Sequence, residues 1–249
     1  MTSSQAGLLT AVFLASAVEF VEAFTIVLAM GVTRGWRSAL WGAAAGVAVL
    51  AVVTAVAGYA LVQWLPESAL QLAVGTLLLI FGLQWLRKAI LRAAGVKALH
   101  DEEEAFAAER EAALRAAPDE RMGLDWFAFV VSFKAVLLEG HEVVFIVITF
   151  GANADSVPLA AAGAAAACAV VVSAGALLRH PLSRVPENTI KFTVGLLLVT
   201  FGTFWLVEGL GGDWPGDDLA LLGLLALWLA ASRAAVAAVR RREPGLLQP

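Results

Sequence analysis

The chain has 249 residues, of which 60% are hydrophobic and 15% charged, and its mean hydropathy is +0.82. A soluble domain is closer to half apolar and a quarter charged, so this composition excludes an ordinary soluble protein. The single cysteine, Cys168, excludes a disulfide framework, a CxxC redox motif and a thiolate metal cage. The net charge of −4 says little alone, because the distribution of charge is the informative part.

Seven stretches of the sequence are long and apolar enough to cross a membrane, for which a helix needs about 20 mostly apolar residues. They lie near residues 7–30, 38–63, 70–90, 126–150, 156–178, 189–210 and 218–239. The N-terminal MTSSQAG lacks the positive region of a cleavable signal, so the first stretch is expected to be a retained helix. We therefore predict an all-α integral membrane protein with seven transmembrane helices.

Two of these helices carry a pair of glutamates in their apolar middle. Glu19 and Glu22 lie in the first helix, and Glu139 and Glu142 lie in the fourth. Each pair is spaced i, i+3, which places both carboxylates on one side of a helix. An acidic side chain at the centre of a membrane helix costs roughly 2.5–3.5 kcal/mol, or roughly 10 kcal/mol for four. A site that binds and moves a cation explains this cost best.

The second acid pair repeats the first at an offset of 120 residues. The same offset aligns VGTLLLIFGLQWL (74–86) with VGLLLVTFGTFWL (194–206), which are identical at 8 of 13 positions without a gap. Each repeat holds three helices, and this odd number inverts the second repeat relative to the first. Inverted repeats are common in transporters, which bind substrate near the midplane. Four glycines of these segments are expected to form close-packing surfaces: Gly75, Gly82, Gly195 and Gly202.

The predicted organisation has four parts. Repeat 1 covers 1–95, a charged cytoplasmic linker covers 96–124, repeat 2 covers 125–212, and a seventh helix with a basic tail covers 213–249. The Ala, Glu and Arg content of the linker favours a helix that ends at Pro118 and Gly123. We interpret the acidic run at 101–104 as part of a solvated helix rather than a cation sensor.

The basic residues predict the orientation. All 17 Lys and Arg except Lys134 fall on one side if the seven helices alternate, with Arg179 and Arg184 in the turn before the sixth helix. The opposite loops carry only acids, such as Glu67, Asp155 and Asp213. The positive-inside rule then predicts an external N-terminus and a cytoplasmic C-terminus in the plasma membrane. Lys134 either snorkels to the cytoplasmic surface or joins the acid cluster.

The predicted metal ligands are Glu19, Glu22, Glu139, Glu142 and His141. Oxygen clusters suit hard cations such as Ca²⁺, Mg²⁺ and Mn²⁺. His141 adds an imidazole that favours Mn²⁺ or Fe²⁺, unless it is a hydrogen-bonded core histidine facing elsewhere. Four clustered carboxylates cannot all stay ionised in a low dielectric, so metal binding should expel protons. This competition is the minimal mechanism of a cation/proton antiporter. The alternative is that protonated acids only hold helices together.

The acid pairs resemble the motifs of the Golgi-type Ca²⁺/Mn²⁺ cation/proton exchanger family, part of the lysine-exporter superfamily. That family has two three-helix repeats, each with a Glu-x-Gly-Asp-(Lys/Arg)-(Thr/Ser) motif, and an acidic linker. The matching stretches here are Glu19-Phe-Val-Glu22-Ala-Phe and Glu139-Gly-His-Glu142-Val-Val. The resemblance covers about 1–210 and implies export of Mn²⁺ or Ca²⁺ in exchange for protons. Glutamate replaces the aspartate of the motif, and its basic and hydroxyl residues are missing.

Two other functions are open. The high-affinity iron permeases carry an Arg-Glu-Gly-x-Glu motif, whose core resembles residues 139–142, although Val18 and Leu138 replace the arginine. That resemblance implies metal uptake. A non-transporting membrane assembly protein is the third alternative. The 3 histidines are dispersed and no GxSxG or HExxH motif occurs, so we expect no enzyme and no cofactor. The expected partners are a divalent cation, protons and the bilayer, with no nucleic acid and a homo-oligomer left open.

Overall fold

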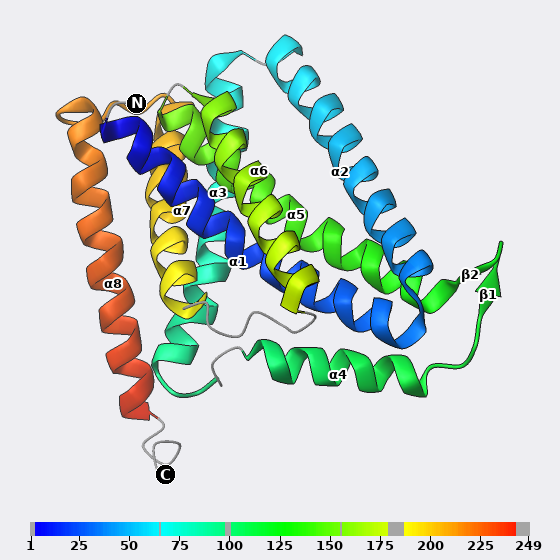
Figure 1. Ribbon diagram of the computed structural model, residues 1–249. Coiled ribbons are helices and arrows are strands. Elements are labelled where there is room, and N and C mark those ends of the chain that lie inside the picture. The colour runs from blue at the N-terminus through cyan, green and yellow to red at the C-terminus, as the bar shows by residue number, and fades with distance from the viewer. Residues whose placement is uncertain (1–2, 65, 98–100, 155, 179–186, 243–249) are drawn as a thin grey trace. The chain divides into compact units, whose positions relative to one another are not determined.

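The computed structural model describes residues 3–64, 66–97, 101–154, 156–178 and 187–242, and helices dominate it (Figure 1). The helices are α1 (Ser3–Arg34), α2 (Trp36–Trp64), α3 (Glu67–Ala93), α4 (Glu102–Arg115), α5 (Trp126–Asn153), α6 (Val157–Leu178), α7 (Glu187–Gly209) and α8 (Ala220–Arg242). A short 3₁₀ helix, η1 (Asp217–Leu219), precedes α8. Strands β1 (Glu120–Arg121) and β2 (Leu124–Asp125) form an antiparallel hairpin between α4 and α5. Asp155, Arg179 and Arg184 lie outside the described residues.

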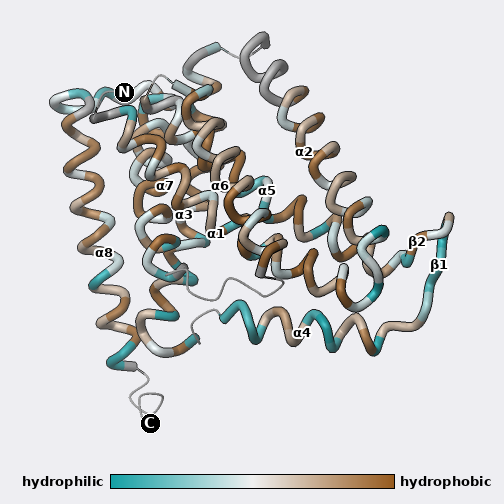
Figure 2. Tube along the Cα trace, viewed as in Figure 1, coloured by the Kyte–Doolittle hydropathy of each residue, from teal (hydrophilic) through white to brown (hydrophobic). Residues whose placement is uncertain are grey.

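The predicted all-α fold with long apolar helices is confirmed. Within the described residues, six helices are long and apolar enough to span a membrane: α1, α2, α3, α6, α7 and α8. Figure 2 shows how apolar residues dominate these helices. The fourth predicted span, α5, is not among the six. It is as long as the others, but Lys134, Glu139 and Glu142 place three charged groups in its central part.

The chain folds into two compact units. Unit 1 comprises Met1–Val56 and Asp101–Val185, and unit 2 comprises Ala57–His100 and Pro186–Pro249. In unit 1, α1 packs against α4, α5 and α6, and in unit 2, α3 packs against α7 and α8. Each unit therefore combines helices from both of the predicted repeats.

Helix α1 is the buried centre of unit 1. Val12, Ala15 and Leu28 are almost completely inaccessible to solvent. Small residues on the surrounding helices allow close approach: a Cβ added at Gly163 of α6 would lie 3.2 Å from the carbonyl oxygen of Leu9. A Cβ at Gly42 of α2 would likewise collide with the carbonyl oxygen of Phe129 on α5. In membranes, where lipid is as apolar as the side chains, such close backbone packing is a main source of helix association.

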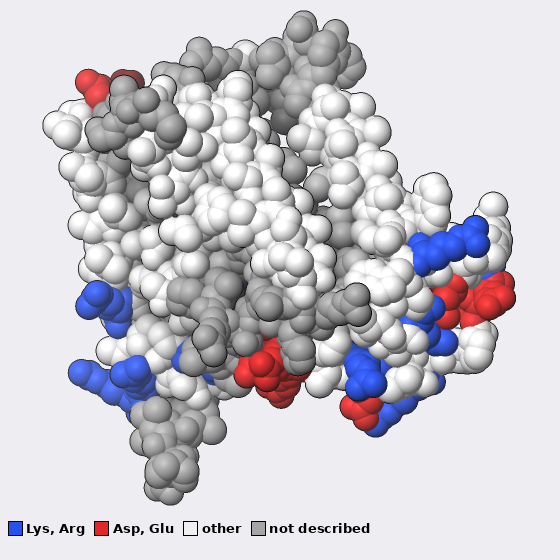
Figure 3. All heavy atoms as spheres, viewed as in Figure 1, with Lys and Arg blue, Asp and Glu red and all other residues white. Residues whose placement is uncertain are grey.

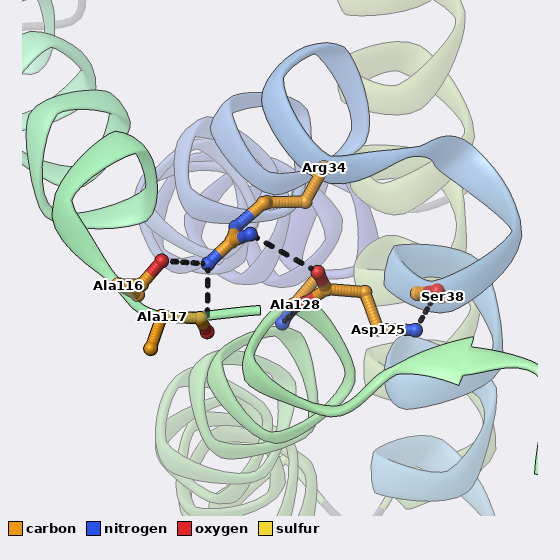
Figure 4. Close-up of polar contacts among 6 residues, drawn as sticks. All are labelled: Arg34, Ser38, Ala116, Ala117, Asp125 and Ala128. Atoms are coloured by element: carbon orange, nitrogen blue, oxygen red, sulfur yellow. Dashed lines mark hydrogen bonds and ion pairs between the residues drawn. The ribbon is translucent and has the colours of Figure 1, made fainter. Parts of the chain in front are cut away.

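An ion pair ties the end of α1 to the start of α5 (Figure 4). Arg34 Nη1 lies 3.3 Å from Asp125 Oδ2, and both side chains are only 14% exposed. Arg34 Nη2 also donates to the carbonyl oxygen of Ala116, at 2.6 Å, at the end of α4. Asp125 caps α5 by accepting from the Ala128 amide at 2.9 Å. One arginine therefore joins α1, α4 and α5.

Replacement of Asp125 by alanine should destabilise unit 1 by about 2–3 kcal/mol, because it removes a helix cap and leaves Arg34 without its carboxylate. Thermal unfolding of the purified protein in detergent measures this loss. Asp119→Ala is the matched control, since Asp119 pairs with Arg121 at the surface, where the two side chains are 44% and 58% exposed. The control should change stability by less than about 1 kcal/mol. Equal losses for the two variants would contradict the assigned role of Asp125.

The predicted glycine surfaces are confirmed in unit 2, where α3 and α7 touch backbone to backbone. A Cβ added at Gly75 would lie 2.6 Å from the Leu206 nitrogen, and one at Gly82 would lie 2.6 Å from the Val199 nitrogen. The contacts seen from α7 are similar: Gly202 faces Leu79 at 2.5 Å, and Gly195 faces Leu86 at 3.2 Å. As the residue number rises along α3 it falls along α7, so the two helices are antiparallel.

Helix α8 joins unit 2 through a few specific contacts. Leu225, Trp228 and Leu229 pack against a buried cluster formed by α3 and α7. The Trp228 indole Nε1 donates to the Thr203 hydroxyl at 3.1 Å. Near the other end, Arg240 Nη2 donates to the carbonyl oxygen of Ala93 at 2.6 Å. Since these contacts advance along both α3 and α8, the two helices run parallel.

The linker contains a capped helix, α4, as its Ala, Glu and Arg content predicted. Asp101 caps α4 by accepting from the amides of Glu103 and Glu104, at 2.8 and 3.3 Å. Within the acidic run, Glu102 is only 7% exposed whereas its neighbours are exposed. The prediction of a solvated helix is therefore wrong for Glu102, which is buried although most of α4 is exposed or half-buried.

Candidate metal centre

The acid pairs lie halfway along their helices. With a rise of 1.5 Å per residue, Glu19 is about 24 Å from the start of α1 and about 22 Å from its end. Glu139 is about 20 Å from the start of α5 and about 21 Å from its end by the same rise. Glu19 is fully buried, with 0% of its surface exposed, and Glu139 and Glu142 are half-buried. A membrane of about 30 Å apolar thickness would place these carboxylates near its midplane.

Helices α1 and α5 bring three of the four glutamates together. One carboxylate oxygen from each of Glu19, Glu139 and Glu142 lies within 4.8 Å of the other two. We call these residues the carboxylate triad. Two of its members come from one i, i+3 pair on α5, and the third comes from the facing side of α1. The contact therefore requires tertiary packing as well as helical spacing.

The carboxylate triad is electrostatically unfavourable without a counter-charge. Two ionised carboxylates separated by 4.8 Å repel each other by about 3.5 kcal/mol at an effective dielectric constant of ~20. Burial adds a desolvation cost for Glu19, whose side chain reaches no solvent. A bound cation removes both costs, and protons on the carboxylates also remove them.

The spacing suits a divalent cation bound by oxygen. Ca²⁺–oxygen distances of 2.3–2.6 Å put opposite ligands about 4.6–5.2 Å apart, and the smaller Mg²⁺ puts them about 4.0–4.2 Å apart. Oxygen atoms within 4.8 Å of one another can therefore contact one ion with little side-chain movement. Carboxylate oxygens also suit Mn²⁺.

The other predicted ligands lie outside the triad. Glu22 is half-buried on α1 and is not grouped with the three acids among the described residues. His141 is also outside the group, and its ring meets Phe145 edge-on with centroids 6.0 Å apart. Lys134 is exposed on α5, which agrees with snorkelling rather than with a place in the acid cluster. Of the predicted set, the structure brings Glu19, Glu139 and Glu142 together.

Buried hydroxyl groups on the same two helices were not predicted from the sequence. Ser16 and Thr25 of α1 and Ser132 of α5 are almost fully buried, and no hydrogen-bond partner for their hydroxyls is present among the described residues. The Thr149 hydroxyl, by contrast, donates to the Phe145 carbonyl at 2.6 Å. Ser16 precedes Glu19 by three residues and so shares its side of α1. The i, i+3 spacing of Ser16 and Glu19 was the sequence signal that could have placed this hydroxyl on the same side of α1 as the glutamate.

Comparison with known proteins adds no relative. No protein-family model, no curated protein and no solved structure matches the chain.

Proposed function

We propose that this chain is a membrane transporter of a divalent metal cation. The observation that carries the proposal is the carboxylate triad, which gathers three acidic oxygens within 4.8 Å in the middle of long apolar helices. Acids in membrane helices are costly and mark ion pathways or proton relays. A purely structural role would need no more than one protonated acid with a hydrogen-bond partner, and it gives no reason to gather three.

Exchange for protons follows from the chemistry of the triad. A divalent cation stabilises the ionised carboxylates, and protons can bind the same oxygens once the cation has left. Metal and protons therefore compete for the same oxygens. We propose that metal leaves the cytoplasm and protons enter. Mn²⁺ and Ca²⁺ are the proposed substrates, and this choice and the direction rest on the resemblance to the Golgi-type exchangers.

We also propose that the two three-helix segments are inverted repeats, and the α3–α7 contact supports this. Gly75 faces Leu206, and the residues 120 positions away, Gly195 and Leu86, face each other as well. The pairs Gly82–Val199 and Gly202–Leu79 have the same relation. A contact in which i meets j and i+120 meets j−120 is what a twofold axis between two copies produces.

The antiparallel direction of α3 and α7 fixes how such an axis would lie. A twofold axis that relates two antiparallel helices runs perpendicular to them. For helices that cross a bilayer, this direction lies in the membrane plane, as in transporters with inverted repeats. Under the 120-residue offset Glu22 is the counterpart of Glu142, so the triad uses one member of this pair.

The proposed topology has seven spans, with α5 as the fourth, in the plasma membrane. The charge asymmetry of unit 2 supports the direction of α8 in this topology, because the acids Asp213 and Asp217 precede α8 whereas Arg240 and Arg241 end it (Figure 3).

Cysteines introduced at Asp213 and Ala107, both exposed, in a Cys168→Ala background should react with an impermeant maleimide from opposite faces of the membrane. Labelling of both cysteines from intact cells would contradict this topology.

Metal flux in proteoliposomes tests the function directly. Purified protein with a pH-sensitive dye inside the vesicles should move Mn²⁺ or Ca²⁺, with proton movement in the opposite direction. A pH gradient should drive metal against its concentration gradient. Fe²⁺ is measured in parallel, because faster Fe²⁺ flux without proton movement would favour a permease instead. No flux of any of the three metals would leave a non-transporting role and overturn the proposal.

A further inference from the structure

A groove of ≈ 390 Å³ lies between α3 and α8 in unit 2. Its walls are mainly apolar, with Leu83, Leu86 and Ile90 on α3 and Trp228, Ala235 and Val239 on α8. Arg87 is the charged residue among the described residues that line it. The groove takes no part in the carboxylate triad, which belongs to unit 1.

The dimensions of the groove match one leaflet of a bilayer. Because α3 and α8 run parallel, the groove extends along both helices, from Trp228 to Val239 on α8. Eleven residues of helix span about 16 Å. Half of the apolar core of a bilayer is about 15 Å thick. A groove of this length that opens on membrane-exposed helices can hold one acyl chain along its axis.

The two helices that form the groove carry a strong positive charge toward their C-terminal ends. Segments 83–97 and 220–242 contain no Asp or Glu. Their basic residues are Arg87, Lys88, Arg92, Lys97, Arg233, Arg240, Arg241 and Arg242. Figure 3 shows Lys and Arg side chains gathered near the C-terminal end of α8. The Arg240–Ala93 hydrogen bond joins the two helices at this end. An anionic group is therefore the complementary occupant of the rim, as in basic lipid-headgroup sites between membrane helices.

We propose that the groove binds an anionic phospholipid, with one acyl chain between α3 and α8 and the phosphate beside Arg87. The apolar walls take the chain from the leaflet on the basic side of the protein. Arg87 lines the groove six residues before α3 ends, and a long arginine side chain can extend from there toward the charged surface while its aliphatic part stays against apolar groups. A zwitterionic phospholipid offers the same chain with no net charge, so it binds more weakly.

Retention of lipid by the purified full-length protein tests this site. Protein is equilibrated with mixed phosphatidylglycerol and phosphatidylcholine vesicles, extracted in mild detergent and analysed by native mass spectrometry. Phosphatidylglycerol should be retained in preference to phosphatidylcholine. Arg87→Gln should weaken its retention about fivefold or more. Lys88→Gln is the matched control, because Lys88 is exposed but does not line the groove, and it should retain the lipid.

Variants that fill the groove show whether the lipid is held by its acyl chain in the groove or only by attraction to the charged surface. Ala235→Phe should displace the lipid without changing any charge. Ala231→Phe, at an exposed position of the lining, tests the same point if Ala235→Phe does not fold. Equal losses in Arg87→Gln and Lys88→Gln would indicate general surface charge and overturn the proposal. Full retention in a folded groove-filling variant, or equal retention of both lipids, would also overturn it.

Discussion

Replacement of Glu19 or Glu142 by glutamine is expected to lower metal transport at least about 100-fold, since loss of even an outer partner of a metal ligand typically costs 10–100-fold. Glutamine keeps the shape of the side chain but removes one ionisable oxygen, so both metal binding and proton carriage suffer. The neutral side chain should also relieve roughly 2.5–3.5 kcal/mol of insertion cost. Activity should therefore fall while thermal stability without metal holds or rises.

The transport assay is paired with thermal unfolding of the same preparations. Glu208→Gln is the matched control: Glu208 is an acid of a membrane-type helix, accepts a hydrogen bond from Gln71 at 3.2 Å, and lies outside the triad. It should transport normally. Glu22→Gln completes the set, and metal affinity at equilibrium should fall less in this variant than in the triad variants. Normal transport by both Glu19→Gln and Glu142→Gln, or unfolding of both, would show that the site is misassigned.

Alanine at Gly82 or Gly202 should strongly reduce the yield of folded protein. The added methyl groups would lie 2.6 Å from the Val199 nitrogen and 2.5 Å from the Leu79 nitrogen. Backbone atoms at that distance can make room only if the helices separate, which removes contacts along the whole α3–α7 interface. Overpacking of a core usually costs about 1–3 kcal/mol, and displacement of a helix backbone should exceed that range. Size-exclusion chromatography and thermal unfolding measure the loss.

Gly223→Ala is the control for this pair of substitutions. Gly223 lies in α8 of the same unit, and nothing lies within 4 Å of a Cβ added there. Alanine also has a higher helix propensity than glycine by about 1 kcal/mol. The control should fold as well as the parent protein or better. If Gly82→Ala and Gly202→Ala behave like the control, the close α3–α7 contact does not exist in the folded protein.

The sequence was enough to predict the elements that depend on local pattern. Apolar length predicted the spanning helices, and the seven-residue spacing of Gly75 and Gly82 predicted a close-packing face. The charged residues of α5 show the limit of that reasoning. Lys134, Glu139 and Glu142 interrupt its apolar run, so a limit on the number of charges misses this helix although its composition is otherwise as apolar as that of α1 and α2.

The membership of the site depended on tertiary geometry that no local pattern contains. The i, i+3 spacing placed each acid pair on one side of its helix, but the crossing of α1 and α5 decides which acids meet. That crossing leaves Glu22 and His141 out of the triad. Arg34 was interpreted only as a marker of orientation, although Asp125, directly before an apolar run, carried the signal of a helix cap. Their pairing over 91 positions could not be inferred from either residue alone.

The number of carboxylates in the triad bears on the electrical character of the proposed exchange. Three ionised groups with one divalent cation carry a net charge of −1, and the same groups with two protons carry −1 as well. The metal-loaded and doubly protonated forms would then respond equally to a membrane potential, which acts on net charge at ~2.3 kcal/mol per elementary charge per 100 mV. An exchanger of this kind would draw its driving force from the pH difference and would work equally well in a depolarised cell.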